Sequence, residues 1–162
     1  MAQQILRPAP EDDARFAKQI ADALRIARRQ FGSVEFDQSE ADLVVLQSIV
    51  DGHAQSPIPP YELECLGIVL GNVIAKRAGL HWVIVADEFG REPALQCQGT
   101  PGLLTPTTMI SKLLTRGQPV NVASLCDQTV HKVYQAKTQA AAAKEQQPDD
   151  AESTSWWNKK LW

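Results

Sequence analysis

The sequence has 162 residues, which is the usual size of a single domain. Apolar residues make up 44% of it and charged residues 22%, so collagen-like, coiled-coil and wholly disordered chains are excluded. The net charge of -3 provides no general attraction to nucleic acids or anionic lipids. The chain has neither an apolar signal segment at its start nor 18 consecutive apolar residues, so we expect a cytoplasmic protein without membrane insertion.

Apolar residues recur every three or four positions in three segments of the N-terminal half. They predict helices over 11–31, from residue 37 or 39 to 51, and over 60–78. A proline-rich segment, 56–60, separates the second helix from the third. The third helix is the most apolar and should be the central buried one. Gly67 and Gly71 on it each weaken a helix interior, which predicts a neighbour that approaches closely.

The C-terminal half begins with a short β-branched and aromatic run, 81–86, which predicts a buried strand. Residues 92–98 can pair back on it as a β-hairpin. A short helix is predicted over 106–115, and a last helix from Asn121. The expected fold is therefore α+β, with about five helices packed around a small antiparallel hairpin or sheet in a single domain, residues 1–140.

Past this domain the composition changes twice. We predict a flexible acidic linker over 141–155 and a tryptophan-rich docking segment over 156–162. Three of the four tryptophans of the chain lie in its last seven residues. Aromatic side chains dominate interface energetics, so the segment should bind a partner or a groove on its own domain. An anionic membrane surface is a competing target. The residues expected to bind are Trp156, Trp157, Leu161 and Trp162.

No catalytic, cofactor or metal motif is present. Cys65, Cys97 and Cys126 are an odd number at spacings of 32 and 29, which suits neither a disulfide framework nor a zinc site. The histidines form no i,i+4 pair and have no cysteine neighbour at ligand spacing. Phosphate-binding loops and nucleophile elbows are also missing. We therefore expect no catalytic residues, no cofactor and no metal.

One polar cluster follows the predicted buried strand. It consists of Asp87, Glu88, Arg91 and Glu92. Carboxylates beside an arginine could position a proton or a cation. The same residues could instead satisfy the amides of a hairpin turn and one another. Both interpretations are open at this point.

The segment from Gly32 to Ala75 holds seven acidic residues and no lysine or arginine. About half of these acids are explained as residues that stabilise helix N-termini. The others could attract a basic protein. The acidic surface predicted to bind a partner comprises Asp37, Glu40 and Asp42.

Three segments in the middle of the chain carry a resemblance to a known family. They are 66–71, then 79–92, then the helix that follows Thr105 and Pro106 and ends at Arg116 and Gly117. Over about residues 66–125 the sequence resembles a bacterial family of uncharacterised function, the domain of unknown function 3806. The resemblance implies a single domain of helices around a small sheet, and it supplies no active site.

These features favour a non-enzymatic cytoplasmic protein-interaction module of a bacterium, similar in kind to an adaptor or an immunity protein. The expected partner is a protein of basic character, bound through the acidic surface, the tail or both, and self-association through the tail is a further expectation. Nucleic acid is not expected as a partner. The alternative is a small enzyme that uses Asp87, Glu88, Arg91 and Glu92 in a cleft.

Overall fold

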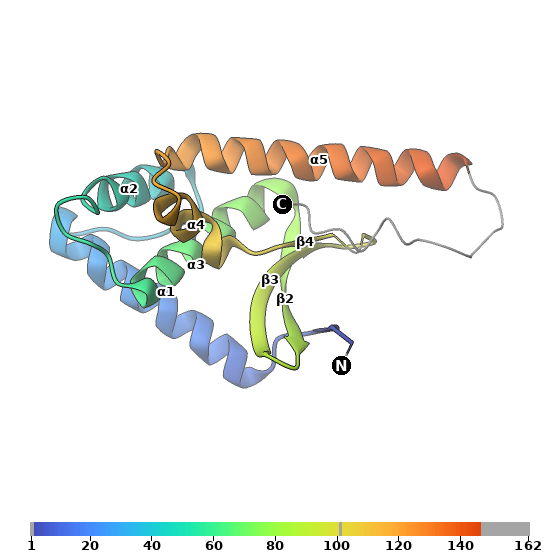
Figure 1. The fold of residues 1–162 in the computed structure, drawn as a ribbon, viewed down its shortest axis with the longest axis horizontal. Coiled ribbons are helices and arrows are strands. Elements are labelled where there is room, and N and C mark those ends of the chain that lie inside the picture. Colours follow the sequence, from blue (N-terminus) through green and yellow to red (C-terminus); the bar gives the residue numbers. More distant parts are fainter. Residues whose placement is uncertain (1, 101, 147–162) are drawn as a thin grey trace.

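The computed structural model describes residues 2–100 and 102–146. Within that part the helices are α1 (Pro10–Phe31), α2 (Glu40–Asp51), α3 (Pro60–Ala78), α4 (Met109–Thr115) and α5 (Val122–Gln146). The strands are β1 (Gln4–Leu6), β2 (Leu80–Asp87), β3 (Gly90–Cys97) and β4 (Leu103–Leu104). Figure 1 shows this arrangement, which confirms the predicted α+β class.

The sheet is antiparallel throughout, in the order β1-β2-β3-β4. The predicted hairpin is β2 and β3, which pair along their whole length from Leu80 with Cys97 to Asp87 with Gly90. The two outer strands were not predicted. β1 has three residues and β4 has two, so neither is long enough to show an alternating pattern.

Helix α3 lies at the centre of the fold, as its apolar composition predicts, and its side chains form the largest part of the main core. The predicted close approach at its two glycines is confirmed. A Cβ atom added to Gly67 would lie 2.6 Å from the carbonyl oxygen of Pro106, and one added to Gly71 would lie 2.6 Å from the ring of Trp82. Both substitutions would force a neighbour to move.

Local signals set the ends of the helices. The Ser39 hydroxyl caps α2 by accepting a hydrogen bond from the backbone N–H of Ala41 at 3.2 Å. Gly79 ends α3 in the left-handed conformation, with φ of 67°. The Asn121 side chain accepts from the backbone N–H of Ser124 at 2.9 Å, which caps α5. Because alanine favours helix, α5 continues to Gln146 and includes residues 141–146, the start of the predicted linker.

Two further observations bear on the predicted surroundings of the protein. No helix in residues 2–100 and 102–146 is both long enough and apolar enough to cross a membrane. The tryptophan-rich segment, with Trp156, Trp157, Leu161 and Trp162, lies outside the described residues.

Candidate functional site

The predicted acidic surface divides into exposed and buried carboxylates. Glu40 and Asp37 are exposed, and Asp37 accepts a hydrogen bond from the backbone N–H of Ser39 at 3.1 Å. Asp42 is buried, and its carboxylate accepts from the backbone N–H groups of Asp37 and Gln38 at 3.2 and 2.8 Å. The prediction that Asp42 binds a partner is therefore wrong. The loop before α2 surrounds the carboxylate, because two backbone N–H groups of this loop donate hydrogen bonds to it.

A groove runs beside the exposed carboxylates, between α2 and α5, and has a volume of about 580 Å³. Its floor and walls combine apolar side chains with carboxylates. Val44, which projects from α2 at the groove, is 69% exposed. The lining residues are Glu40, Leu43, Val44, Gln47, Ser48, Asp51, Arg77, Asn121, Ala123 and Asp127. A groove with both kinds of side chain suits a ligand that carries positive charge next to apolar groups.

The charges in the groove are only partly compensated. Arg77 forms an ion pair with Asp127 at 2.8 Å, and Asp127 raises the pKa of the arginine. The other two carboxylates, Glu40 and Asp51, form no ion pair with any residue in the described part of the chain. The groove thus holds an excess of negative charge on the α2 side.

Gln47 makes one end of this groove rigid. Its side-chain amide donates to Asp51 at 2.8 Å and to the carbonyl oxygen of Val120 at 2.9 Å. Its own side-chain oxygen accepts from the backbone N–H of Val122 at 2.7 Å. Two of these bonds join α2 to the start of α5, and the third, within α2, orients the Asp51 carboxylate before any ligand arrives. Sequence reasoning did not find this residue, because its two backbone partners, Val120 and Val122, are more than 70 positions away.

The polar cluster on the hairpin has the contacts of a turn and an ion pair. The Asp87 carboxylate accepts from the backbone N–H of Phe89 at 2.8 Å across the turn. Arg91 points to α1, where it forms an ion pair with Asp12 at 2.7 Å. Glu88 and Glu92 are exposed, and Glu92 lies opposite Val85 in the strand pairing. The arginine is therefore engaged by a residue that sequence reasoning did not connect with it.

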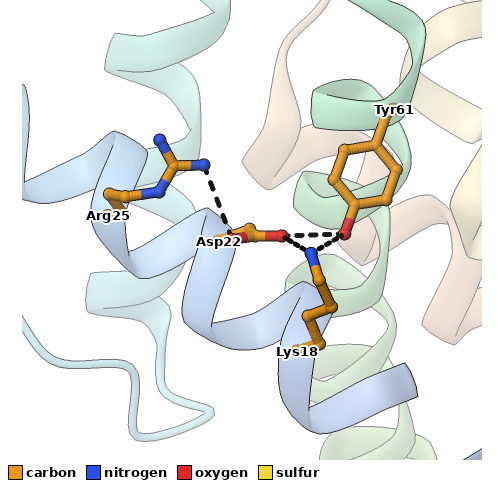
Figure 2. Close-up of polar contacts among 4 residues, drawn as sticks. All are labelled: Lys18, Asp22, Arg25 and Tyr61. Atoms are coloured by element: carbon orange, nitrogen blue, oxygen red, sulfur yellow. Dashed lines mark hydrogen bonds and ion pairs between the residues drawn. The ribbon is translucent and has the colours of Figure 1, made fainter.

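Figure 2 shows a second polar cluster, which the sequence analysis missed. The Asp22 carboxylate accepts from Lys18 at 2.8 Å and from the Tyr61 hydroxyl at 2.8 Å, and Arg25 lies 3.5 Å away. Hydrogen bonds from Lys18 and Tyr61 lower the pKa of Asp22 to about 2. The hydrogen bond to Asp22 also raises the pKa of Tyr61, so the phenol keeps its proton and does not act as a base at neutral pH.

This cluster joins α1 to the first turn of α3. The spacing of Lys18 and Asp22 by four positions is a signal that the sequence contained. Tyr61 is 39 positions from Asp22, and no local pattern connects the two. The contacts of this cluster hold α1 against α3.

Two of the three cysteines lack the environment of reactive thiols. Cys65 and Cys126 are both buried, and burial raises the pKa of each thiol. Arg77 contacts the Cys126 sulfur at 3.3 Å, but its effect is smaller than that of burial. Cys97 is half-buried at the end of β3. In residues 2–100 and 102–146, no three His, Cys, Asp or Glu side chains are grouped so that they could hold a metal ion.

Comparison with known proteins places the chain in a family. The model of the domain of unknown function DUF3806 matches residues 42–125, which is about half of the chain. The chain belongs to this family. The match confirms the resemblance seen in the sequence and begins earlier than expected, so it takes in nearly all of α2 as well as the hairpin and the start of α5.

The fold also occurs in a solved structure. A crystal structure from Bacteroides thetaiotaomicron is similar with a TM-score of 0.69 and 18% sequence identity, over 80% of this chain and 48% of that one. This chain therefore spans about half the length of the structure it matches. At this identity the likeness shows a shared fold. No curated protein matches the chain.

Proposed function

We propose that this protein is a non-enzymatic interaction module of the bacterial cytoplasm, and that the groove between α2 and α5 binds a basic segment of a protein partner. The observation that carries the proposal is the pair of carboxylates, Glu40 and Asp51, which lack a cation partner among the described residues and border the exposed Val44. A lysine or arginine next to an apolar side chain complements this surface.

The contacts of the groove support binding rather than catalysis. Arg77 is engaged by Asp127, and Gln47 is held by three hydrogen bonds. The residues that line the groove with Glu40 and Asp51 include no cysteine and no histidine. Ser48 is the one lining residue with a hydroxyl group. Ser48 accepts a hydrogen bond from Gln30 at 2.7 Å, and among the described residues no base accepts a hydrogen bond from its hydroxyl group. An adaptor or an immunity protein works by such binding alone.

The proposal is tested by charge reversal in the groove. The double variant Glu40→Lys, Asp51→Lys is compared with the parent and with Glu11→Lys, Glu64→Lys, a control with the same charge change at exposed positions outside the groove. Each protein is used to capture partners from a bacterial lysate, and the association rate of a partner bound by the parent is measured at low and high salt.

We expect the groove variant to associate at least tenfold more slowly at low salt and the control to associate nearly as fast as the parent, because charge near an interface acts mainly on the association rate. The parent's rate should fall as salt increases. Equal rates for the parent and the groove variant would refute the proposal. Circular dichroism of all three proteins shows whether each is folded.

A further inference from the structure

Four residues of α2 form a straight line along the groove between α2 and α5. They are Glu40, Val44, Gln47 and Asp51. At about 100° per residue, the four side chains lie within about 60° of one another around the helix axis. Glu40 and Asp51 are the first and last residues of α2, and the helix rises about 16 Å between them. The line therefore presents a carboxylate at each end and the exposed Val44 between them.

The two carboxylates stand at opposite ends of the α2 dipole. Glu40 is at the N-terminal end, where the partial positive charge of the helix stabilises a carboxylate. Asp51 is at the C-terminal end, which is partially negative, and the last turn of α2 contains no basic residue. The Gln47 amide donates to Asp51 at 2.8 Å but carries no net charge. A cation from a partner therefore compensates more repulsion at Asp51 than at Glu40.

The other wall of the groove is also helical. It consists of Arg77 near the end of α3, Ala123 and Asp127 of α5, and Asn121 just before α5. Figure 1 shows α2 beside the first turns of α5. None of the strands in the described part of the chain lines the groove. An extended peptide pairs its backbone with a free strand edge, whereas a helix satisfies its own backbone groups, so the groove favours a helix.

The size of the groove limits how a helix can bind in it. A helix with its side chains is about 10 Å or more in diameter, so a length of about 16 Å occupies about 1,200 Å³. The groove has a volume of about 580 Å³. Only one stripe of side chains can enter it, and the opposite side of the bound helix stays in water. The bound helix must therefore be amphipathic.

We propose that the partner segment in the groove is an amphipathic α-helix that lies antiparallel to α2, with a basic side chain on each carboxylate. This inference rests on the proposed function and adds the conformation, direction and residue spacing of the partner. In the antiparallel direction, the positive end of the partner helix is next to Asp51. Its basic residues stand at positions i and i+11, opposite Asp51 and Glu40, and an apolar residue at i+7 meets Val44.

A second copy of this chain does not supply such a helix from its described residues. Among these helices, only Lys18 and Arg29 of α1 are basic residues at positions i and i+11. The residue at i+7 between them is Arg25, which would place a third positive charge on the apolar Val44. The partner is therefore another protein.

The first experiment compares the binding of three synthetic peptides, each about 18 residues long and built mainly from alanine. The matched peptide has lysine at i and i+11 and leucine at i+7, and a hydrocarbon staple on its far side keeps it helical. In the displaced peptide, the second lysine is moved to i+9, on the opposite side of the stapled helix. The proline peptide has the matched residues, no staple and two central prolines, which prevent helix formation.

Fluorescence anisotropy at low salt measures the Kd of each peptide for the full-length protein. We expect the matched peptide to bind at least tenfold more tightly than the other two. If a control peptide binds as tightly as the matched one, and Glu40→Lys, Asp51→Lys weakens both, the helical inference falls and the proposed function stands. No binding of the matched peptide up to about 1 mM also overturns the helical inference alone, because capture from a lysate tests the proposed function.

The second experiment determines the direction of the bound helix by exchanging charges. Asp51→Lys should weaken binding of the matched peptide at least tenfold, and it should leave the fold intact because a basic residue suits the C-terminal end of a helix. A peptide with glutamate at i should recover most of this loss. Recovery by glutamate at i+11 would overturn the antiparallel direction, and recovery by neither peptide would overturn the contact with Asp51.

The third experiment ranks the two carboxylates with substitutions that remove charge and keep shape. Asp51→Asn should weaken binding of the matched peptide about tenfold and Glu40→Gln about threefold, because only Asp51 stands at the negative end of the α2 dipole. Glu64→Gln, at an exposed position outside the groove, is the control and should leave the Kd unchanged. Equal losses for Asp51→Asn and Glu40→Gln would overturn the ranking.

Discussion

Helices α1 and α2 each bury an aspartate at the third position of the first turn, and the two carboxylates experience opposite environments. Asp12 of α1 is 5% exposed and Asp42 of α2 is 2% exposed. Asp12 accepts from the backbone N–H of Ala9 at 2.8 Å and forms an ion pair with Arg91. Asp42 accepts from two backbone amides and has no cation within ion-pair distance in the described residues.

The pKa values record this difference. The pKa of Asp12 lies below its ordinary value, chiefly because the backbone N–H of Ala9 stabilises the carboxylate, with help from Arg91. The pKa of Asp42 lies above its ordinary value, because burial disfavours the charge by more than its two backbone hydrogen bonds compensate. Two acids at equivalent helix positions therefore differ because burial outweighs the hydrogen bonds at Asp42, whereas the Ala9 hydrogen bond, helped by Arg91, outweighs burial at Asp12.

The largest effect is expected from Asp12→Ala. The change removes charge-assisted hydrogen bonds to Ala9 and Arg91, and should lower the free energy of unfolding at pH 7 by about 1.5 to 3 kcal/mol. Urea denaturation of parent and variant measures this loss. Asp13→Ala, an exposed acid in the same turn, is the control and should change stability by less than about 0.5 kcal/mol. Equal losses for the two variants would show that the pairing contributes nothing.

Asp42→Ala should cost less, about 1 to 2 kcal/mol. It leaves two backbone amides without their acceptor, but it also removes the penalty of a buried charge. Asp42→Asn, which keeps an acceptor oxygen and has no charge, should cost under about 1 kcal/mol. The same urea titrations compare all variants. A loss for Asp42→Ala larger than that for Asp12→Ala would contradict the comparison.

The contributions of the two aspartates to the free energy of unfolding should also depend on pH in opposite directions. The stabilisation from Asp12 is complete above the ordinary aspartate pKa of about 3.9 and is lost as pH falls through its lower native pKa. For Asp42 the native pKa is raised, so stability falls as pH rises from about 3.9 through that native value. Asp22, with a pKa of about 2, behaves like Asp12.

Differences in unfolding free energy between the parent and the variants Asp12→Asn and Asp42→Asn, measured from pH 2 to pH 8, isolate each group. The contribution of Asp22 cancels in both differences, since all three proteins keep it. The parent should gain stability over Asp12→Asn as pH rises in the acid range. Relative to Asp42→Asn it should lose stability as pH rises above about 3.9. Slopes of the same sign would show that the pKa values of the two aspartates are not shifted in opposite directions.

The smallest effect is expected at Gln38, which donates its backbone N–H to Asp42 with φ of 65°. This left-handed conformation costs a side-chain-bearing residue about 1 to 2 kcal/mol, and glycine avoids the cost at an entropic penalty of about 0.5 to 1 kcal/mol. Gln38→Gly should therefore stabilise the protein by roughly 0.5 kcal/mol, seen as a higher urea midpoint. Gln55→Gly, where φ is not positive, should destabilise it.

Much of the fold was predictable because local signals determine it. Pro10, the first-turn acids and Gly32 mark α1, and the observed helix begins and ends within a residue of the prediction. The hairpin followed from a β-branched run and its return, and Gly67 and Gly71 correctly indicated a close neighbour. Strands β1 and β4 were missed for two reasons. β1 forms only by pairing with a strand that is distant in the sequence, and β4 pairs over a very short segment.

The candidate site was predictable only in outline. The absence of lysine and arginine from 33–74 indicated an acidic surface, and Glu40 and Asp51 do line a groove. The loop before α2 determines whether an acid faces solvent or a backbone amide. Asp42 was therefore predicted to be exposed, although it is buried against two amides. Gln47 and Arg77 contribute through contacts with α5 that no local pattern contains.

By itself, the sequence determined where the helices and the hairpin lie, because hydrophobic periodicity, proline, glycine and capping residues act over a few positions. Only the tertiary structure decided the polar contacts between residues that are distant in the sequence. Arg91 reaches Asp12 across 79 positions, and Tyr61 reaches Asp22 across 39. An ion pair depends on the distance and burial of two side chains, and both are set when α1, α3 and the hairpin pack together. The same packing leaves Glu40 and Asp51 at the groove without a described cation.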